Sequence, residues 1–146
     1  MAHSGTASRP WADDCSGSTI AEMVAQLGEL VAEAPQHRGT LVDLVDTLRA
    51  KLRTRFIRYD DDLLAEAVFQ APWLTGFAEA LRHEHVELLR VLETLRERAA
   101  RSDEGVAAQR GLEQSYHEFV ELLGKHDGGR RNLIYESQLC QGHLHE

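Results

Sequence analysis

The stretch "LRHEHVELLRVLETL", residues 81–95, decides the fold class. Core-type positions recur in it at alternating intervals of four and three residues, which places them along one face of an α-helix. That face carries Leu81, His85, Leu88, Leu92 and Leu95. We therefore predict a long helix over residues 73–100 whose buried face is interrupted by one histidine.

Three other segments show the same spacing and predict helices over residues 18–34, over residues 40–68, and from residue 106 towards residue 140. Pro35, Pro72 and the "RSDEG" stretch at residues 101–105 separate the segments. Such short connections favour antiparallel neighbours. The sequence therefore predicts an all-α, antiparallel up-down-up-down four-helix bundle over residues 18–140. We expect a disordered tail at residues 1–17 and a frayed tail at residues 141–146.

The composition excludes several classes of function. A length of 146 residues suits one domain, and a formal net charge of −8 argues against general binding to nucleic acid. No apolar run reaches the roughly 18 residues that span a membrane, and the start of the chain lacks the apolar core of a signal peptide. We expect a cytoplasmic protein with no nucleic-acid or membrane partner. A protein partner and the oligomeric state are left open.

Polar side chains replace apolar ones on three of the predicted buried faces. Buried polar groups are costly unless they are paired or functional. The arginines among them need acceptors, and Asp60, Glu84 and Asp127 are the neighbouring carboxylates. We therefore predict a polar layer in the core, made of Arg55, Tyr59, His85, His126 and Arg130.

The last predicted helix carries Gly128 and Gly129 between His126 and Arg130. Each glycine inside a helix costs roughly 1 kcal/mol relative to alanine. Three interpretations remain open. The glycines let a bulky neighbouring side chain (Tyr59, Arg55 or Trp73) approach the helix backbone, they permit a kink or a π-bulge, or the helix ends at Gly128 and restarts near Asn132.

Three stretches together resemble a known family. They are "LRHEHVELLRVLETL" at residues 81–95, "FVELLGKHDGGRRNLIYE" at residues 119–136 and, more weakly, "LRTRFIRYDDDLL" at residues 52–64. The resemblance is to the hemerythrin-like (HHE) domain and covers about residues 18–139. It implies an antiparallel four-helix bundle that holds two irons through histidines and bridging carboxylates.

Only part of the family's ligand set is matched here. His85 and His126 match two of its histidine positions, and Asp60 matches an acidic position that is not usually a ligand. The positions where another residue replaces a family ligand are Ile20, Arg55, Tyr59 and Arg130. The resemblance therefore implies a hemerythrin-like bundle with a degenerate di-iron site.

Three functions follow from these residues. The first is a non-catalytic structural, interaction or regulatory module without a cofactor. The second is a mononuclear iron or zinc site formed by His85 and His126 with Asp60 or a water molecule. The third is a small-anion site in which Arg55 and Arg130 hold a phosphate or carboxylate, with His85, His126 and Tyr59 as further donors. Since no nucleophile and base occur at a recognisable spacing, we do not expect an enzyme.

The two cysteines lie near opposite ends of the chain. In the predicted topology, Cys15 and Cys140 come to the same end of the bundle, together with His143 and His145. These four side chains either form an adventitious zinc site or remain as reduced thiols and free histidines at the chain ends.

Overall fold

The computed structural model describes residues 19–101 and 105–144, and this part of the chain is helical with no strand. The elements are α1 (Ile20–Ala32), the 3-10 turn η2 (Ala34–Gln36), α2 (Arg38–Arg55), the π-helical turn η3 (Phe56–Asp60), α3 (Asp61–Gln70), the 3-10 turn η4 (Pro72–Leu74), α4 (Thr75–Ala100) and α5 (Val106–Leu144). Because α2, η3 and α3 follow one another without a break, these elements form four helical segments. The predicted all-α class is confirmed.

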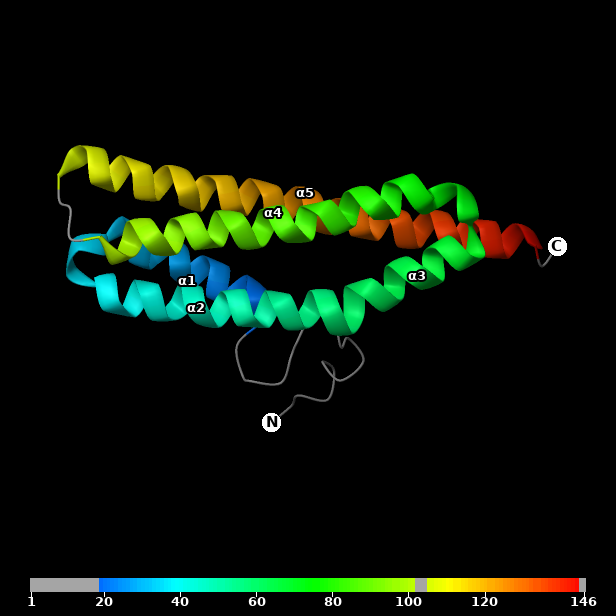
Figure 1. The fold of residues 1–146 in the computed structure, drawn as a ribbon, viewed down its shortest axis with the longest axis horizontal. Helices are drawn as coiled ribbons and strands as arrows, with labels where there is room; N and C mark the ends of the chain where they lie inside the picture. Colours follow the sequence, from blue (N-terminus) through cyan, green and yellow to red (C-terminus); the bar gives the residue numbers. More distant parts are fainter. Residues whose placement is uncertain (1–18, 102–104, 145–146) are drawn as a thin grey trace.

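The four segments lie side by side along one long axis (Figure 1). The turn between α1 and α2, the end of α4 and the start of α5 lie at one end of this axis, and the turn between α3 and α4 lies towards the other. α1 packs on α2 and α5, α2 packs on α4, and α4 packs on α5. α1 has 13 residues and α5 has 39, so α1 accompanies α5 along only part of its length.

Local sequence explains where α1 begins and how the turns form. The Thr19 hydroxyl accepts a hydrogen bond from the Glu22 backbone N–H at 3.0 Å, and the Glu22 carboxylate accepts one from the Thr19 N–H at 3.0 Å. This reciprocal capping box satisfies two N–H groups that have no partner inside the helix. A proline is the second residue of η2 and the first residue of η4, where its missing N–H costs no hydrogen bond.

α5 is a continuous α-helix through Gly128 and Gly129, so neither the π-bulge nor the restart near Asn132 occurs. A Cβ atom on Gly129 would lie only 3.0 Å from Cδ2 of Leu81 in α4. This close approach at Gly129 agrees with the first interpretation, although the approaching residue is Leu81 and not Tyr59, Arg55 or Trp73. α5 also extends to Leu144, beyond the end that we expected near residue 140.

Two apolar clusters fill the interior. The larger one is built by α1, α2 and the adjoining parts of α4 and α5, and includes Leu52, Phe56, Leu88 and Leu123. The smaller one is built by α3, the start of α4 and a later part of α5, and includes Leu64, Leu81 and Leu133. Along the three helical segments other than α1, buried polar residues lie between these two clusters, including Asp60, His85, His126 and Arg130. The core therefore has a polar layer between two apolar blocks.

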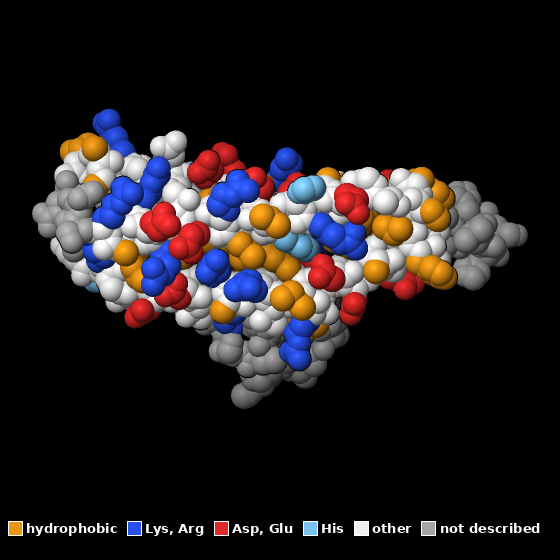
Figure 2. Space-filling view, in the orientation of Figure 1, with side chains coloured by type: hydrophobic (Ala, Val, Ile, Leu, Met, Phe, Trp, Pro, Cys, Tyr) orange, Lys and Arg blue, Asp and Glu red, His pale blue; other side chains and the backbone are white. Residues whose placement is uncertain are grey.

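The surface of the bundle carries charge of both signs. On the face shown in Figure 2, Lys and Arg side chains lie among Asp and Glu side chains. Cross-helix ion pairs on the surface include Arg96 with Asp46 at 2.6 Å and Arg49 with Glu93 at 3.6 Å. None of the helices in the described ranges is long and apolar enough to cross a membrane.

Candidate functional site

The π turn η3 brings Asp60 into the core. Phe56 and Asp60 are both buried, with 4% and 1% of their surface exposed, whereas Tyr59 is half-buried. A π turn adds a residue to the helical turn and shifts the register of everything that follows. Our prediction of Tyr59 in the polar layer is therefore wrong in register, and Asp60 occupies that position.

Asp60 meets two histidines from two other helices. Its Oδ2 atom lies 3.2 Å from Nε2 of His85 in α4 and 3.4 Å from Nε2 of His126 in α5. All three residues are buried, and one potential ligand atom from each lies within 4.8 Å of the other two. The three residues that we predicted for a mononuclear site are thus brought together.

A second carboxylate holds the other side of the His126 ring. Nδ1 of His126 lies 2.8 Å from Oε1 of Glu84, a neighbour of His85 on α4. Lys125 approaches the same carboxylate, with its Nζ atom 3.9 Å from Oε2 of Glu84. Each nitrogen of the His126 ring therefore faces a carboxylate oxygen, which fixes the ring plane between α4 and η3.

Phe56 positions the two histidine rings. Its ring stacks on that of His85 with centroids 3.9 Å apart and an angle of 10° between the planes. It meets the ring of His126 edge-on, with centroids 5.7 Å apart. The aromatic contacts close the site on its apolar side and limit rotation of both imidazoles.

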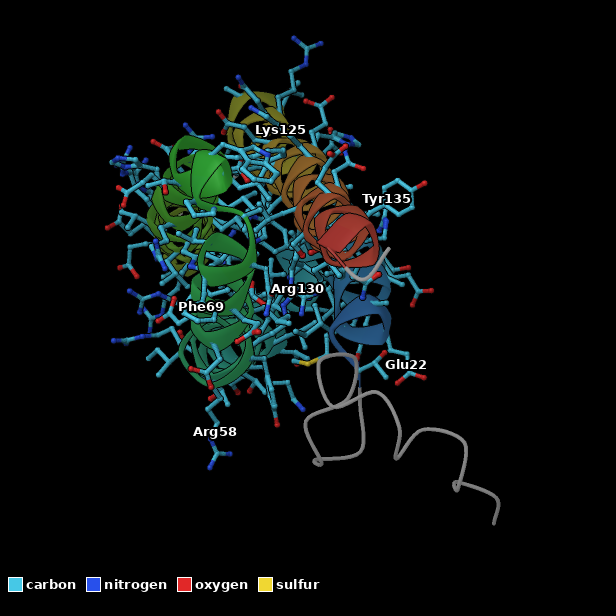
Figure 3. All side chains as sticks on the ribbon, turned by 90° about the vertical axis from the view of Figure 1, so that its right-hand side faces the viewer. Glu22, Arg58, Phe69, Lys125, Arg130 and Tyr135 are labelled. Carbon is cyan, nitrogen blue, oxygen red and sulfur yellow. The ribbon has the colours of Figure 1, made fainter. Side chains whose placement is uncertain are left out.

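Arginines supply positive charge at the other edge of the layer. Nε of Arg130 lies 2.7 Å from Oδ1 of Asp60, an ion pair that lacks hydrogen-bond alignment. A terminal nitrogen of Arg55 donates to Oδ1 of Asp127 at 2.6 Å. Of the three carboxylates that we expected to accept from the arginines, Asp60 and Asp127 pair with them. The third, Glu84, instead faces His126. Figure 3 shows Arg130 between the helices, in contrast to Arg58, which points away from them.

These contacts set the charge state of Asp60. Burial by itself raises the pKa of its carboxyl group. The hydrogen bonds with His126 and His85 lower that pKa, and the positive charges of Arg130 and Arg55 lower it further. The lowering effects outweigh burial, so the pKa of Asp60 lies well below its ordinary value. Asp60 is therefore an ionised carboxylate at neutral pH.

The remaining candidates from the sequence lie elsewhere. Cys15 and His145 are outside the described residues, and Cys140 and His143 belong to the last turns of α5, where side chains are not described. The sequence reasoning missed Phe56 as a wall of the site. The signal that identifies it is the four-residue spacing of Leu52, Phe56, Asp60 and Leu64.

Comparisons with known proteins do not assign this chain to a family. Neither the protein-family models, nor the curated proteins, nor the solved structures contain a match to the chain. The resemblance to hemerythrin-like domains therefore depends on the three sequence stretches quoted above.

Proposed function

We propose that this protein binds one divalent transition-metal ion through Oδ2 of Asp60 and Nε2 of His85 and His126. The observation that carries the proposal is the convergence of these three buried ligand atoms, which come from three helices. Atoms roughly 2.1 Å from a tetrahedral zinc ion lie about 3.4 Å from one another. The separations of 3.2 and 3.4 Å from Asp60 to the two histidines match that geometry.

The contacts of His126 support a cation in this place. A neutral imidazole has one N–H group and donates to only one of two carboxylates. A proton on Nε2 makes the hydrogen bond with Asp60 at 3.4 Å. When Nδ1 instead donates its proton to Glu84, a metal cation takes the place of the Nε2 proton between Nε2 and Oδ2 of Asp60. Metal-bound histidines usually donate a hydrogen bond from their other ring nitrogen to a carboxylate, as His126 does here to Glu84.

Asp60 is suited to the role of the anionic ligand. Its carboxylate is ionised, and Arg130 engages Oδ1, which leaves Oδ2 directed at the two histidines. Two imidazoles and one carboxylate are a ligand set used both for zinc and for non-haem iron(II). Three protein ligands leave at least one coordination position for water or a small molecule. We infer a single ion because the described residues bring together one carboxylate and two histidines.

We further propose that the helices form the antiparallel up-down-up-down bundle predicted from the sequence, in a hemerythrin-like arrangement. The short turn η2 between α1 and α2 and the turn η4 between α3 and α4 support this topology. The packing of α1 on both α2 and α5 supports it as well. In this arrangement, the metal ligands come from the second, third and fourth helical segments.

The test is a measurement of bound metal per chain. Purified protein is stripped with a chelator, titrated with zinc and, anaerobically, with iron(II), and analysed by elemental mass spectrometry. We expect one ion per chain, and loss of that ion in His85→Ala and His126→Ala. His83→Ala is the matched control, because His83 is an exposed histidine two residues from His85 on α4. A Cys15→Ser, Cys140→Ser double variant removes the thiols near the chain ends and is expected to keep the ion.

The ion pairs of the layer favour a second candidate function. Arg130 with Asp60 and Arg55 with Asp127 join α5 to the segment formed by α2, η3 and α3. Such buried pairs can fix the register of packed helices without any metal, as in a non-catalytic structural or interaction module. A folded protein that retains no zinc or iron after titration would exclude the first function and leave this second one.

A further inference from the structure

A cavity of about 560 Å³ lies beside the polar layer, between the start of α1 and the middle of α5. Its volume is within the range of sites that hold small organic molecules. One side is apolar and is formed by Ile20 and Val24 of α1 with Val120 and Leu123 of α5. α1 begins at this level, and among the described residues no helix covers α5 on that side beyond Thr19.

The other side of the cavity is strongly basic. Arg55, Arg130 and Arg131 line it together with a single acidic residue, Asp127, which gives these side chains a formal charge of +2 in a chain whose net charge is −8. Arg55 has only 8% of its surface exposed, and its Nε atom is buried without a hydrogen-bond partner in the described part of the chain. A buried guanidinium nitrogen such as Nε of Arg55 requires an acceptor group, and an anion in the cavity supplies one.

We propose that this cavity binds a small organic carboxylate. Its head group meets the guanidinium groups of Arg55, Arg130 and Arg131, and its hydrocarbon part lies against the apolar side formed by α1 and α5. Planar guanidinium groups match the planar carboxylate. The apolar side distinguishes an organic acid from inorganic phosphate, which has nothing to bury there.

This proposed site differs in position and in lining from the anion site that we considered from the sequence. The sequence placed Arg55 and Arg130 in the core with His85, His126 and Tyr59 as co-donors. The arginines reach the cavity, whereas the described residues that line it include neither histidine nor Tyr59. Arg130 is common to both sites, because it lines the cavity and also pairs with Asp60. The carboxylate site nevertheless does not depend on a bound metal.

The first experiment is isothermal titration of the full chain with acetate, butyrate and hexanoate at constant ionic strength in the presence of EDTA. The chelator separates this proposal from the metal proposal. We expect affinity to rise roughly fourfold with each added methylene, as for burial of hydrocarbon. We also expect 1-hexanol to bind at least about tenfold more weakly than hexanoate, because it lacks the charge that the arginines hold. Equal affinities across the acids, or equal affinities of inorganic phosphate and hexanoate, would overturn the proposal.

The second experiment fills the cavity. A Cβ atom on Gly124, which lines the cavity, meets nothing within 4 Å, so Gly124→Leu places its side chain there without a clash at the backbone. We expect this variant to lose at least about tenfold in hexanoate affinity. Gly76→Leu is the matched control, since Gly76 is an exposed helical glycine of α4 with equally open surroundings. Arg131→Gln, at an exposed position, is expected to weaken hexanoate and leave 1-hexanol unchanged. Unaltered hexanoate binding by Gly124→Leu would show that the acid binds elsewhere and would overturn the assignment.

Discussion

Glu84 and His126 face each other across the interface of α4 and α5, with Oε1 of Glu84 2.8 Å from Nδ1 of His126. In the proposed metal-bound form, Nδ1 of His126 donates to Glu84 and Nε2 faces the ion. We predict that Glu84→Gln weakens metal binding by about 10- to 100-fold, as for other losses of a group that hydrogen-bonds the far nitrogen of a metal-bound histidine. The measurement is a competition titration of zinc against a chromophoric chelator.

Glu87→Gln is the matched control for this variant. Glu87 lies on the same helix three residues later, but it is exposed and pairs with Arg90 on the surface. We expect its zinc affinity to equal that of the unaltered protein. If Glu84→Gln and Glu87→Gln bind zinc equally well, Glu84 does not act through His126.

Asp60 is expected to be the residue of the polar layer on which the stability of the metal-free protein depends most. Asp60→Asn keeps the shape of the side chain but removes the negative charge opposite Arg130. Loss of one partner from a buried ion pair leaves the other charge uncompensated, and we predict a loss of about 3 kcal/mol in the free energy of unfolding. Urea denaturation in EDTA measures it. Asp61→Asn, at the exposed neighbouring position, is expected to stay within about 0.5 kcal/mol of the unaltered protein.

The stabilising effect of Asp60 has a defined pH dependence. Its pKa is lower in the folded protein than the value of about 3.9 in an unfolded chain. The ionised form is therefore favoured by folding, and its contribution is fully present above pH ~4 and is lost as the pH falls towards the folded pKa. We predict that the difference in unfolding free energy between the metal-free protein and Asp60→Asn narrows as the pH falls below about pH 4. A difference that does not change down to pH 2 would contradict the assigned ion pairs.

The helices could be predicted because their buried faces follow one period. Leu88, Leu92 and Leu95 repeat at intervals of four and three residues, and all three are fully buried. The same regularity identified His85 and His126, since each stands where that period requires an apolar residue. Local pattern is sufficient for such residues, because burial within a regular helix depends only on angular position.

The position of Asp60 could not be predicted from a regular period. Core residues of this segment include Leu52, Phe56, Asp60 and Leu64, which are spaced by four residues three times in succession. In a regular α-helix, each such step turns the buried face by about 40°, and three steps would turn it by about 120°. The π turn at Phe56–Asp60 accommodates this drift, because it holds more residues per turn. A model with an unbroken 3.6-residue period therefore assigns the core position to Tyr59.

Contacts between helices could not be predicted from the spacing of residues within single helices. The pair of Arg55 and Asp127 joins residues 72 positions apart, and its formation depends on how α2 is rotated against α5. The cavity beside it depends on where α1 begins relative to α5. Neither quantity is encoded in one segment, because both arise from the packing of the complete bundle.

Gly28 is the glycine at which an added side chain would most disturb the packing of α1 against α5. A Cβ atom at this position would lie 2.5 Å from Oη and 2.9 Å from Cζ of Tyr116, whose hydroxyl donates to the Val24 carbonyl at 3.2 Å. The ring can yield only by giving up that hydrogen bond or by pushing α1 away. Although alanine is favoured over glycine within a helix by about 1 kcal/mol, we predict that Gly28→Ala lowers the free energy of unfolding by about 1–3 kcal/mol. Gly124→Ala, in open surroundings, is expected to raise it by up to about 1 kcal/mol. Urea denaturation of the two variants checks both signs, and a Gly28→Ala protein as stable as Gly124→Ala would show that α1 does not approach Tyr116 this closely.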